Sequence, residues 1–463
     1  MRYSIAILVL LLLFDASVSV AQDLDTIWTR QFGASESSFV ITKSICSTHD
    51  NNFLAAGYCG DSSNDLDIFL VKFDSHGDTL WTKTIGDPTV SEEGMYCVST
   101  YDYGFIITGF KPITPDNHDW SLVKTDPEGN SIWERVYHLG DPQSRSYFVE
   151  ETTDKGFIMC GYSGDDYSSR GDRSVVIVKT DSLGEGELSS WEWISKFDIN
   201  GNQDNRSYCV RQTVDGGFIV AGATGSSDVM DMFLLKLDQV GDSVWCQSYE
   251  SPGGESWGRS VAQASDGGYL VVGQDGVESL PHGIYVVKTD GGGNVLYSWQ
   301  YQLGSDCDLY SVNRHPAGGF IASGQASGDA LLMRLDDIGD TLWTFVFGTS
   351  EQEYAQDVYA SADEQYYTAG WVMVPTEVYL AKVGYLPSYI CGDANVSGAV
   401  DIDDVVYLIA YIFSGGPEPV PYESGDTNCS GGVDIDDVVY LISYIFSGGF
   451  APCDPDGNGT PDC

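Results

Sequence analysis

Residues 215–222 read DGGFIVAG, and this phrase is one of seven variants that lie between residues 51 and 370. Each variant closes on a glycine, and successive closing glycines are 52, 52, 61, 51, 51 and 46 residues apart. A period of about 50 residues indicates a repeat architecture in which each period forms one supersecondary unit. The closing glycines are Gly57, Gly109, Gly161, Gly222, Gly273, Gly324 and Gly370.

Two more phrases recur within each period. One is a hydrophobic run with a single base, such as IFLVKFD at residues 68–74. The other is Gly-(Asp/Asn)-x-x-Trp, around Trp81, Trp133, Trp245 and Trp343. Runs of β-branched and aromatic residues are typical of strands, and the Gly-Gly and Asp-x-x-Gly segments between them are typical of tight turns. Four short antiparallel strands per period, repeated seven times, predict an all-β fold, a seven-bladed β-propeller.

The two ends of the repeat region indicate how the ring closes. Residues 27–32, IWTRQF, match the tryptophan phrase, and residues 378–384, VYLAKVG, match the phrase that precedes it in a period. We therefore expect the first strand to complete the last blade. The repeat phrases resemble those of secreted bacterial propeller proteins, and the resemblance covers residues 25–384.

Each period also carries one base at the same point of its hydrophobic phrase. Six of the seven have an aspartate two positions later, which predicts structural ion pairs or solvated faces rather than a ligand site. The bases are Lys72, Lys124, Lys179, Lys236, Lys288, Arg334 and Lys382.

A second, shorter repeat occupies the C-terminal end. DANVSGAVDIDDVVYLIAYIFSGG starts at residue 393, and DTNCSGGVDIDDVVYLISYIFSGG starts 33 residues later. Oxygen donors at loop positions 1, 3, 5, 7 (a backbone carbonyl), 9 and 12, with glycine at position 6, form the ligand pattern of a calcium loop. The predicted Ca²⁺ ligands are Asp393, Asn395, Ser397, Ala399, Asp401 and Asp404 in the first loop, and Asp426, Asn428, Ser430, Gly432, Asp434 and Asp437 in the second.

An apolar helix is expected after each loop but none before it, so the two units are half EF-hands whose helices should pack on each other. This duplicated unit resembles the type I dockerin over residues 391–453. The resemblance implies attachment to a cohesin-type scaffold protein through loop positions 10 and 11. These positions hold Ile402, Asp403, Ile435 and Asp436, where cellulosomal dockerins usually have hydroxyl residues, so the identity of the partner stays open.

The chain ends in DPDGNGTPDC, which resembles a thrombospondin type 3-like calcium segment. Its spacing leaves open both a further calcium site and a flexible acidic tail over residues 454–463. The candidate ligands are Asp454, Asp456, Asn458 and Asp462. Four cysteines at this end permit three pairings, one of which joins the first to the third: Cys391, Cys429, Cys453 and Cys463. The other seven cysteines are predicted to be buried thiols.

The N-terminal end predicts export. A base at residue 2, an apolar run over residues 5–14 and Ser-Val-Ala at residues 19–21 indicate a signal peptide over residues 1–21. No later segment is expected to span a membrane, and residues 385–390 are expected to be a linker. The ratio of 68 acidic to 22 basic residues argues against nucleic acid and anionic lipid as ligands. Residues 391–463 hold thirteen acids and no lysine or arginine, which fits bound calcium.

Function is expected on the face that carries the variable segments between the phrases. Aromatic residues among acids and amides there fit carbohydrate binding, protein binding or plain loop packing: Trp120, Tyr167, Trp257 and Trp371. No nucleophile elbow or metal-ligating histidine pattern occurs, so no catalytic residue is assigned. A docked, non-catalytic binding propeller is the main hypothesis. The alternative is a polysaccharide-degrading glycoside hydrolase or lyase, which two carboxylates about 5–10 Å apart in the central channel would favour.

Overall fold

The computed structural model describes residues 24–33, 39–60, 66–87, 90–114, 117–164, 173–185, 193–201, 204–226, 229–276, 282–385 and 390–452. Several predicted features lie outside these ranges: the signal peptide, Tyr167, Cys453, Cys463 and the four candidate ligands of residues 454–463. The chain divides into two compact units, Met1–Gly384 and Tyr385–Cys463. The described residues contain 28 strands and two α-helices, so the fold is mainly β.

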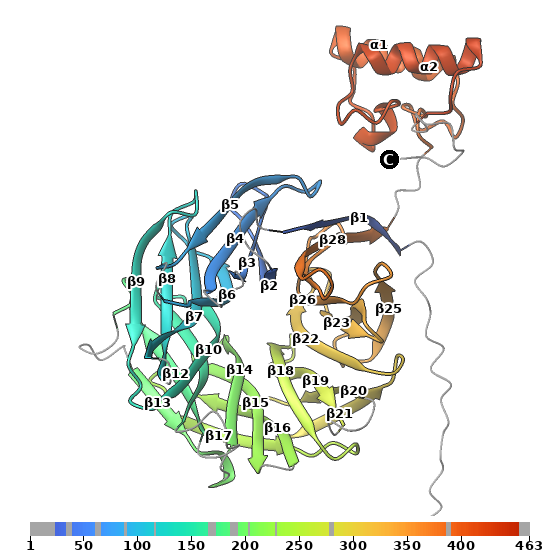
Figure 1. The fold of residues 1–463 in the computed structure, drawn as a ribbon. Coiled ribbons are helices and arrows are strands. Elements are labelled where there is room, and N and C mark those ends of the chain that lie inside the picture. The colour runs from blue at the N-terminus through green and yellow to red at the C-terminus, as the bar shows by residue number, and fades with distance from the viewer. Residues whose placement is uncertain are drawn as a thin grey trace, which may run out of the picture. The chain divides into compact units, whose positions relative to one another are not determined.

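The strands form antiparallel groups of four that succeed one another around a ring (Figure 1). The first groups are β2 (Phe39–Ser47), β3 (Phe53–Gly60), β4 (Leu66–Phe73), β5 (Thr79–Ile85); β6 (Glu93–Ser99), β7 (Phe105–Thr114), β8 (Asn117–Thr125), β9 (Ser131–Tyr137); and β10 (Gln143–Glu151), β11 (Phe157–Gly164), β12 (Arg173–Thr180), β13 (Trp193–Phe197). The next are β14 (Asp204–Gln212), β15 (Phe218–Ser226), β16 (Val229–Leu237), β17 (Ser243–Tyr249); and β18 (Ser256–Gln263), β19 (Tyr269–Asp275), β20 (Gly283–Thr289), β21 (Val295–Tyr301). The last are β22 (Cys307–Arg314), β23 (Phe320–Ala326), β24 (Asp329–Leu335), β25 (Thr341–Phe347); and β26 (Glu353–Ala360), β27 (Tyr366–Val372), β28 (Glu377–Tyr385) with β1 (Leu24–Phe32).

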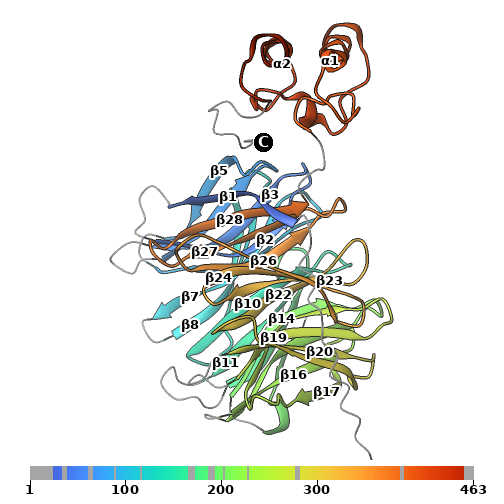
Figure 2. The ribbon, with the colours of Figure 1, turned by 90° about the vertical axis from the view of Figure 1, so that its right-hand side faces the viewer.

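This arrangement is propeller-like, as predicted. β1 is hydrogen-bonded beside β28, and both views show the two strands next to each other (Figures 1 and 2). The prediction that the first strand completes the last group is therefore confirmed. The two ends of the ring are joined by strand pairing, and β1 covers the edge that β28 would otherwise expose.

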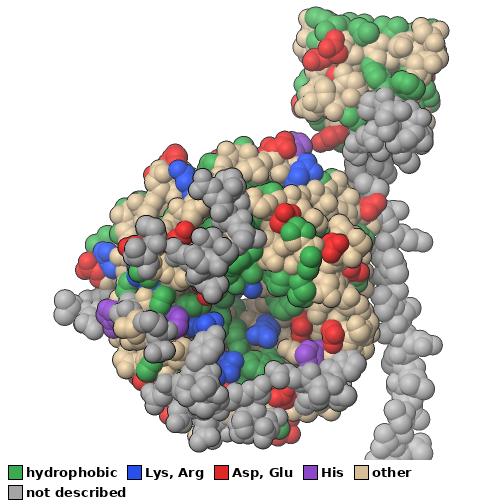
Figure 3. All heavy atoms as spheres, viewed as in Figure 1, with side chains coloured by type: hydrophobic (Ala, Val, Ile, Leu, Met, Phe, Trp, Pro, Cys, Tyr) green, Lys and Arg blue, Asp and Glu red, His purple; other side chains and the backbone are tan. Residues whose placement is uncertain are grey.

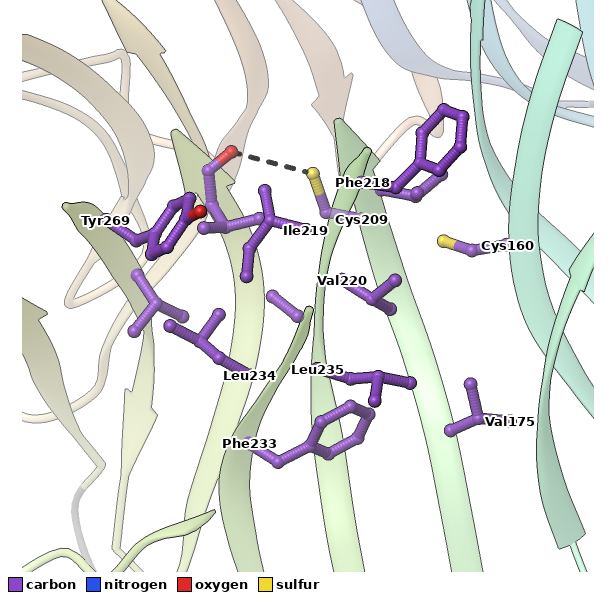
Figure 4. Packing of buried hydrophobic residues seen from close by; sticks show 14 of the residues in the cluster. Cys160, Val175, Cys209, Phe218, Ile219, Val220, Phe233, Leu234, Leu235 and Tyr269 are labelled. Carbon is purple, nitrogen blue, oxygen red and sulfur yellow. Dashed lines mark hydrogen bonds between the residues drawn. The ribbon is translucent and has the colours of Figure 1, made fainter. Parts of the chain in front are cut away.

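The cores lie between neighbouring groups. The middle strands of each group are buried on both faces, so they read as continuous apolar runs rather than alternating ones. Figure 4 shows this packing on both faces of the sheet: the thiol of Cys209 points to the side of Ile219 and Tyr269, and Phe218, Val220 and Leu235 point to the side of Cys160. The Cys209 thiol donates to the Val261 carbonyl of the next group at 3.9 Å. Cys97, Cys160, Cys209 and Cys307 are free buried thiols, as predicted, whereas the prediction was wrong for Cys46 and Cys246, whose side chains are only partly buried.

The tryptophan phrase holds neighbouring groups together. Trp81 of β5 packs on Gly129 of the following group, where an added Cβ would lie 2.6 Å from the indole. Trp133 of β9 packs on Gly184 in the same way, again at 2.6 Å. Both glycines have a positive φ, which the tight turn requires. The glycine thus serves the turn and the contact with the preceding group at once.

Five of the seven recurring bases, all of them lysines, form structural ion pairs, but with a different aspartate from the one predicted. Lys288 has a side chain that is 1% exposed, and its Nζ lies 2.8 Å from Asp266 in the turn before β19. The aspartate two positions after the lysine, Asp290, instead accepts backbone N–H bonds from Gly292 and Asn294. The same pairing, at 2.6–3.1 Å, joins Lys72 to Asp50, Lys124 to Asp102, Lys179 to Asp154 and Lys236 to Asp215.

The C-terminal unit contains α1 (Ile402–Ser414) and α2 (Ile435–Ser447), which lie side by side (Figure 2). Their shared core includes Val405, Leu408, Val438 and Leu441, so the predicted packing of each helix on its twin is confirmed. Each helix starts with an aspartate capping box and ends at a glycine in the left-handed region. Among the described residues, no helix has the length and apolar character needed to cross a membrane.

Candidate functional site

The innermost strand of each group carries a β-bulge at the same place. One residue of β2, for example, has no partner on β3, because the pairing skips from Thr42 to Ser44. A bulge turns its extra residue away from the normal alternation. The seven extra residues are Lys43, Met95, Tyr147, Tyr208, Arg259, Tyr310 and Gln356.

The closing glycines of the sequence repeat make these bulges possible. A Cβ on Gly273 would lie 1.7 Å from the Trp257 carbonyl oxygen, two residues before the bulge residue Arg259. The equivalent separation at the other six closing glycines is between 1.6 and 2.0 Å. Only a residue without a side chain permits this approach. We therefore call these seven extra residues the bulge ring.

All seven bulge-ring residues line one central cavity of about 610 Å³. This volume is in the range of pockets for small ligands. Basic side chains gather around the hollow at the centre of the ring, with hydrophobic side chains between them (Figure 3). The lining also includes Arg206, Trp257, Tyr354, Trp371 and one carboxylate, Glu255.

The aromatic side chains of the cavity contact one another and the bases. The ring centres of Tyr147 and Tyr208 lie 5.2 Å apart. Tyr354 stacks on Trp371, with 4.4 Å between the ring centres and 12° between the ring planes. Lys43 lies 5.8 Å from the centre of the Trp371 ring. The cavity wall therefore alternates positive charge with ring systems.

Arg259 belongs to the same aromatic wall. Its guanidinium lies 4.8 Å from the Tyr208 ring and 5.3 Å from the Trp257 ring. Arg206 also lies 5.3 Å from Trp257, and it pairs with Asp204 at 2.7 Å. Arg206 thus has an ion-pair partner, which it shares with Arg173 at 3.1 Å, whereas the short-range contacts of the Arg259 side chain with described residues are to rings alone.

The electrostatics of the cavity follow from burial. Burial lowers the pKa of Lys43 to about 8; Glu93 opposes the shift and Arg259 adds to it. Burial also raises the pKa of Asp308 and of Glu93, although the neighbouring bases act against both shifts. One oxygen of Asp308 is buried and has no hydrogen-bond partner among the described residues. The charged groups of the cavity are therefore poorly solvated.

The aromatic residues predicted for the functional face divide into two kinds. Trp257 and Trp371 line the cavity. Trp120 does not, and the prediction was wrong for it: its side chain is fully buried, packs on Gly161 and donates from Nε1 to the Tyr162 carbonyl. The bulge ring itself was not predicted. Its signal was present, because every bulge-ring residue precedes its closing glycine by fourteen positions.

The two predicted calcium loops have the same internal hydrogen bonds. Asp393, at position 1, accepts from the backbone N–H groups of Ser397 at 2.8 Å and Gly398 at 2.7 Å. Asp404, at position 12, is fully buried and accepts from the N–H groups of Asn395 at 3.1 Å and Asp401 at 2.8 Å. In the second loop Asp426 accepts from Ser430 and Gly431, and Asp437 from Asn428 and Asp434, at 2.8–3.2 Å.

The glycine at position 6 has φ near +90° in both loops, which favours a residue without Cβ. Side-chain oxygens of carboxylate, amide and hydroxyl type, as in Asp393, Asn395 and Ser397, are the donors that a hard cation such as Ca²⁺ prefers. Within the described part of the chain, however, no three His, Cys, Asp or Glu side chains come together as a metal cluster. The donor chemistry fits calcium, and the two sites stay predictions.

The predicted partner-binding residues are all exposed. Ile402 and Ile435 each keep 46% of their surface exposed at the start of their helices. Each begins an apolar stripe at positions i, i+4, i+7 and i+11, and the exposed fractions of equivalent residues in the two stripes agree within one percentage point. The stripes are Ile402, Val406, Ile409 and Phe413 on α1, and Ile435, Val439, Ile442 and Phe446 on α2.

One of the four cysteines at the C-terminal end, Cys429 in the second loop, is disulfide-bonded.

No protein-family model and no curated protein matches this chain. Among solved structures, the polysaccharide lyase Uly1 has a TM-score of 0.47 and 11% identity, covering 74% of this chain and 90% of that one. Sqt1 from Chaetomium thermophilum has a TM-score of 0.44 and 12% identity, covering 75% and 82%. The GH93 alpha-L-arabinofuranosidase of Fusarium graminearum has a TM-score of 0.44 and 10% identity, covering 78% and 98%. Likeness at this level carries no conclusion about activity or ligand.

Proposed function

We propose that this chain is an exported, seven-bladed propeller that holds a ligand in its central cavity and is attached to a cohesin-type partner by a dockerin-like module. The signal peptide and the repeat phrases support export and the blade count. The attachment rests on one observation above all: the two helices of the C-terminal unit present the same exposed apolar stripe. Single exposed apolar residues are common, but a duplicated stripe is typical of a binding surface.

Calcium would be held in each loop by the side-chain oxygens at positions 1, 3, 5, 9 and 12 and the carbonyl at position 7. The ion supplies the positive charge that lets so many acids share one small unit. Asp404 and Asp437 link each loop to the first turn of its helix. Through these residues the ion would fix the angle at which each apolar stripe is presented.

The near-equality of the two stripes supports binding in either of two orientations. Calorimetry of the full-length protein against a cohesin domain from the same organism tests this. Ile402→Ala with Asp403→Ala should leave affinity nearly unchanged, as should Ile435→Ala with Asp436→Ala. The fourfold variant should not bind. Loss of binding in one double variant alone would show that the two stripes are not equivalent, and full binding by the fourfold variant would refute docking through these stripes.

A catalytic role is the second candidate, and Lys43 is the observation that favours it. An amine with a pKa of about 8 beside an arginine can act as a base toward a sugar whose carboxylate the arginine neutralises. In such a β-elimination the C5 proton passes to Lys43, a C4–C5 double bond forms as the C4–O glycosidic bond breaks, and the leaving oxygen takes a proton from water. Ultraviolet absorbance of the unsaturated product, on incubation of acidic polysaccharides with the full-length protein, tests this. Absorbance that Lys43→Met abolishes would favour the lyase.

A further inference from the structure

The central cavity contains two bases that have no acidic partner at ion-pair distance. Lys43 and Arg259, both in the bulge ring, form no ion pair or hydrogen bond with any described residue. The chain has 68 acids for 22 bases, and bases close to the cavity do find partners, as Arg206 does with Asp204. Two unpaired bases in so acidic a protein therefore mark a place where an external anion is needed.

The two bases also repel each other. Arg259 contributes to the lowered pKa of Lys43, so their positive charges act on one another across the cavity. The acids that face them, Glu93 and Asp308, attract them only from beyond ion-pair distance. Both acids are themselves poorly solvated, which raises their pKa values. A bound anion would relieve the repulsion between the bases.

Hydrogen-bonding groups that have no partner in the described part of the protein line the same cavity as these bases. The hydroxyl groups of Tyr147, Tyr208, Tyr310 and Tyr354, all of which line the cavity, form no hydrogen bond with described residues. Tyrosine hydroxyls both donate and accept, so this wall suits a ligand that carries several hydroxyl groups. The ring systems behind them suit the C–H faces of a sugar.

We propose that the cavity binds an acidic sugar, a pyranose with one singly charged group, with that group between Lys43 and Arg259 and the sugar hydroxyls on the tyrosines. The charged group is a carboxylate or a sulfate ester. This inference rests on the central cavity being the ligand site of the proposed function. Glu255 and Glu93 in and beside the lining disfavour a doubly charged phosphate.

Calorimetry of the full-length protein tests the proposal with four probes. These are an oligogalacturonate, a sulfated galactan oligosaccharide, a neutral galactan oligosaccharide and inorganic sulfate. We expect at least one acidic oligosaccharide to bind, and the neutral one and sulfate to bind at least tenfold more weakly. The acidic probe that binds identifies the charged group.

The variants Lys43→Met and Arg259→Met should each weaken that binding about 10- to 100-fold, because each removes one charge-assisted contact. Lys43→Arg should retain most of the affinity, which separates lost charge from lost folding. Lys83→Met, on the outer strand β5, is the matched control and should bind as the parent does. Thermal melting of every variant reports on its folding.

Equal binding of the neutral oligosaccharide, or unchanged affinity in both methionine variants, would overturn the inference. If Tyr310→Ala then lost the neutral sugar, the cavity would still be the ligand site and only the ligand class would be wrong. Binding of inorganic sulfate as tightly as the oligosaccharides would show a bare anion site and also overturn it. Absence of binding by every probe would refute the acidic-sugar assignment, while docking through the C-terminal unit is measured separately.

Discussion

The seven closing glycines give the sharpest test of how this fold is held. Gly273→Ala adds a Cβ that would lie 1.7 Å from the Trp257 carbonyl oxygen, 2.9 Å from its carbon and 3.0 Å from the Arg259 nitrogen. All three are backbone atoms, so no side chain can rotate to make room. Cβ atoms essentially never approach within 3.0 Å, so β18 and β19 must separate by at least 1.3 Å at this point.

The cost of that separation can be converted into a melting temperature. Overpacking typically costs 1–3 kcal/mol, and a forced shift of backbone in a buried strand pair belongs at the upper end, about 3 kcal/mol. Unfolding entropy of about 2.1 cal/mol/K per residue, over roughly 360 residues, gives about 0.75 kcal/mol/K. Gly273→Ala should therefore lower the Tm by about 4 °C.

Differential scanning calorimetry of the full-length protein measures this shift. Gly33→Ala is the matched control, because an added Cβ there meets only the Glu377 side chain at 3.8 Å, an ordinary contact. Its Tm should stay within about 1 °C of the parent. A Tm for Gly273→Ala equal to that of the control would refute the reasoning, since the bulge would then tolerate a side chain opposite it.

Four further outcomes are expected. Excess chelator should speed amide hydrogen exchange in α1 and α2 of the full-length protein, because the binding energy of calcium at such sites is largely folding energy. The double variant Asp404→Ala with Asp437→Ala should show the same faster exchange without chelator. Unchanged exchange would contradict the calcium sites. Removal of residues 22–34, which include β1, should lower the Tm or cause aggregation, since the edge of β28 becomes exposed; a stability equal to the parent would contradict the closure. For Asp266, burial alone would raise the pKa, but the Lys288 ammonium and the Gly268 N–H lower it. Its ion pair therefore stabilises the fold above about pH 4, and this stability is lost as the pH falls through the lowered pKa of Asp266 in the folded state. Asp266→Asn should lower the Tm at pH 7, and by progressively less as the pH falls below about 4. A Tm shift that does not diminish with falling pH would exclude the ion pair as its cause. Affinity for an acidic sugar should fall as the pH rises through about 8, because Lys43 loses its proton there, and Lys43→Arg should abolish that fall; the same pH profile in both proteins would exclude Lys43 as the titrating group.

Much of the fold follows from local sequence. The four-strand period is predictable because each strand phrase and each turn phrase recurs with little change, and ring closure is predictable because the first phrase in the chain is the one missing at its end. The partner of Lys288 was not predictable from spacing alone. Residue 290 follows the lysine by two positions, but it begins a tight turn, and its carboxylate accepts the N–H groups of that turn.

The cavity was harder to predict for a different reason. A search for repeats finds positions whose residue type stays the same, whereas the bulge ring changes from lysine to methionine, tyrosine, arginine and glutamine. Only the glycine opposite each bulge repeats. Trp120 was wrongly predicted to lie on the functional face. An aromatic residue near a variable segment can equally belong to the core, and nothing in the sequence around Trp120 distinguishes a core position from a surface position.

Because of the bulge and its glycine, the stability of the ring does not depend on which side chains line the cavity. The glycine accommodates backbone atoms, so the side chain at the bulge does not have to fit anything inside the blade. A change of side chain at any of the seven positions therefore leaves the strand pairing of its own group in place. A propeller with such bulges can acquire a new ligand through substitutions at the seven bulge-ring positions, and a designer could introduce these substitutions one at a time.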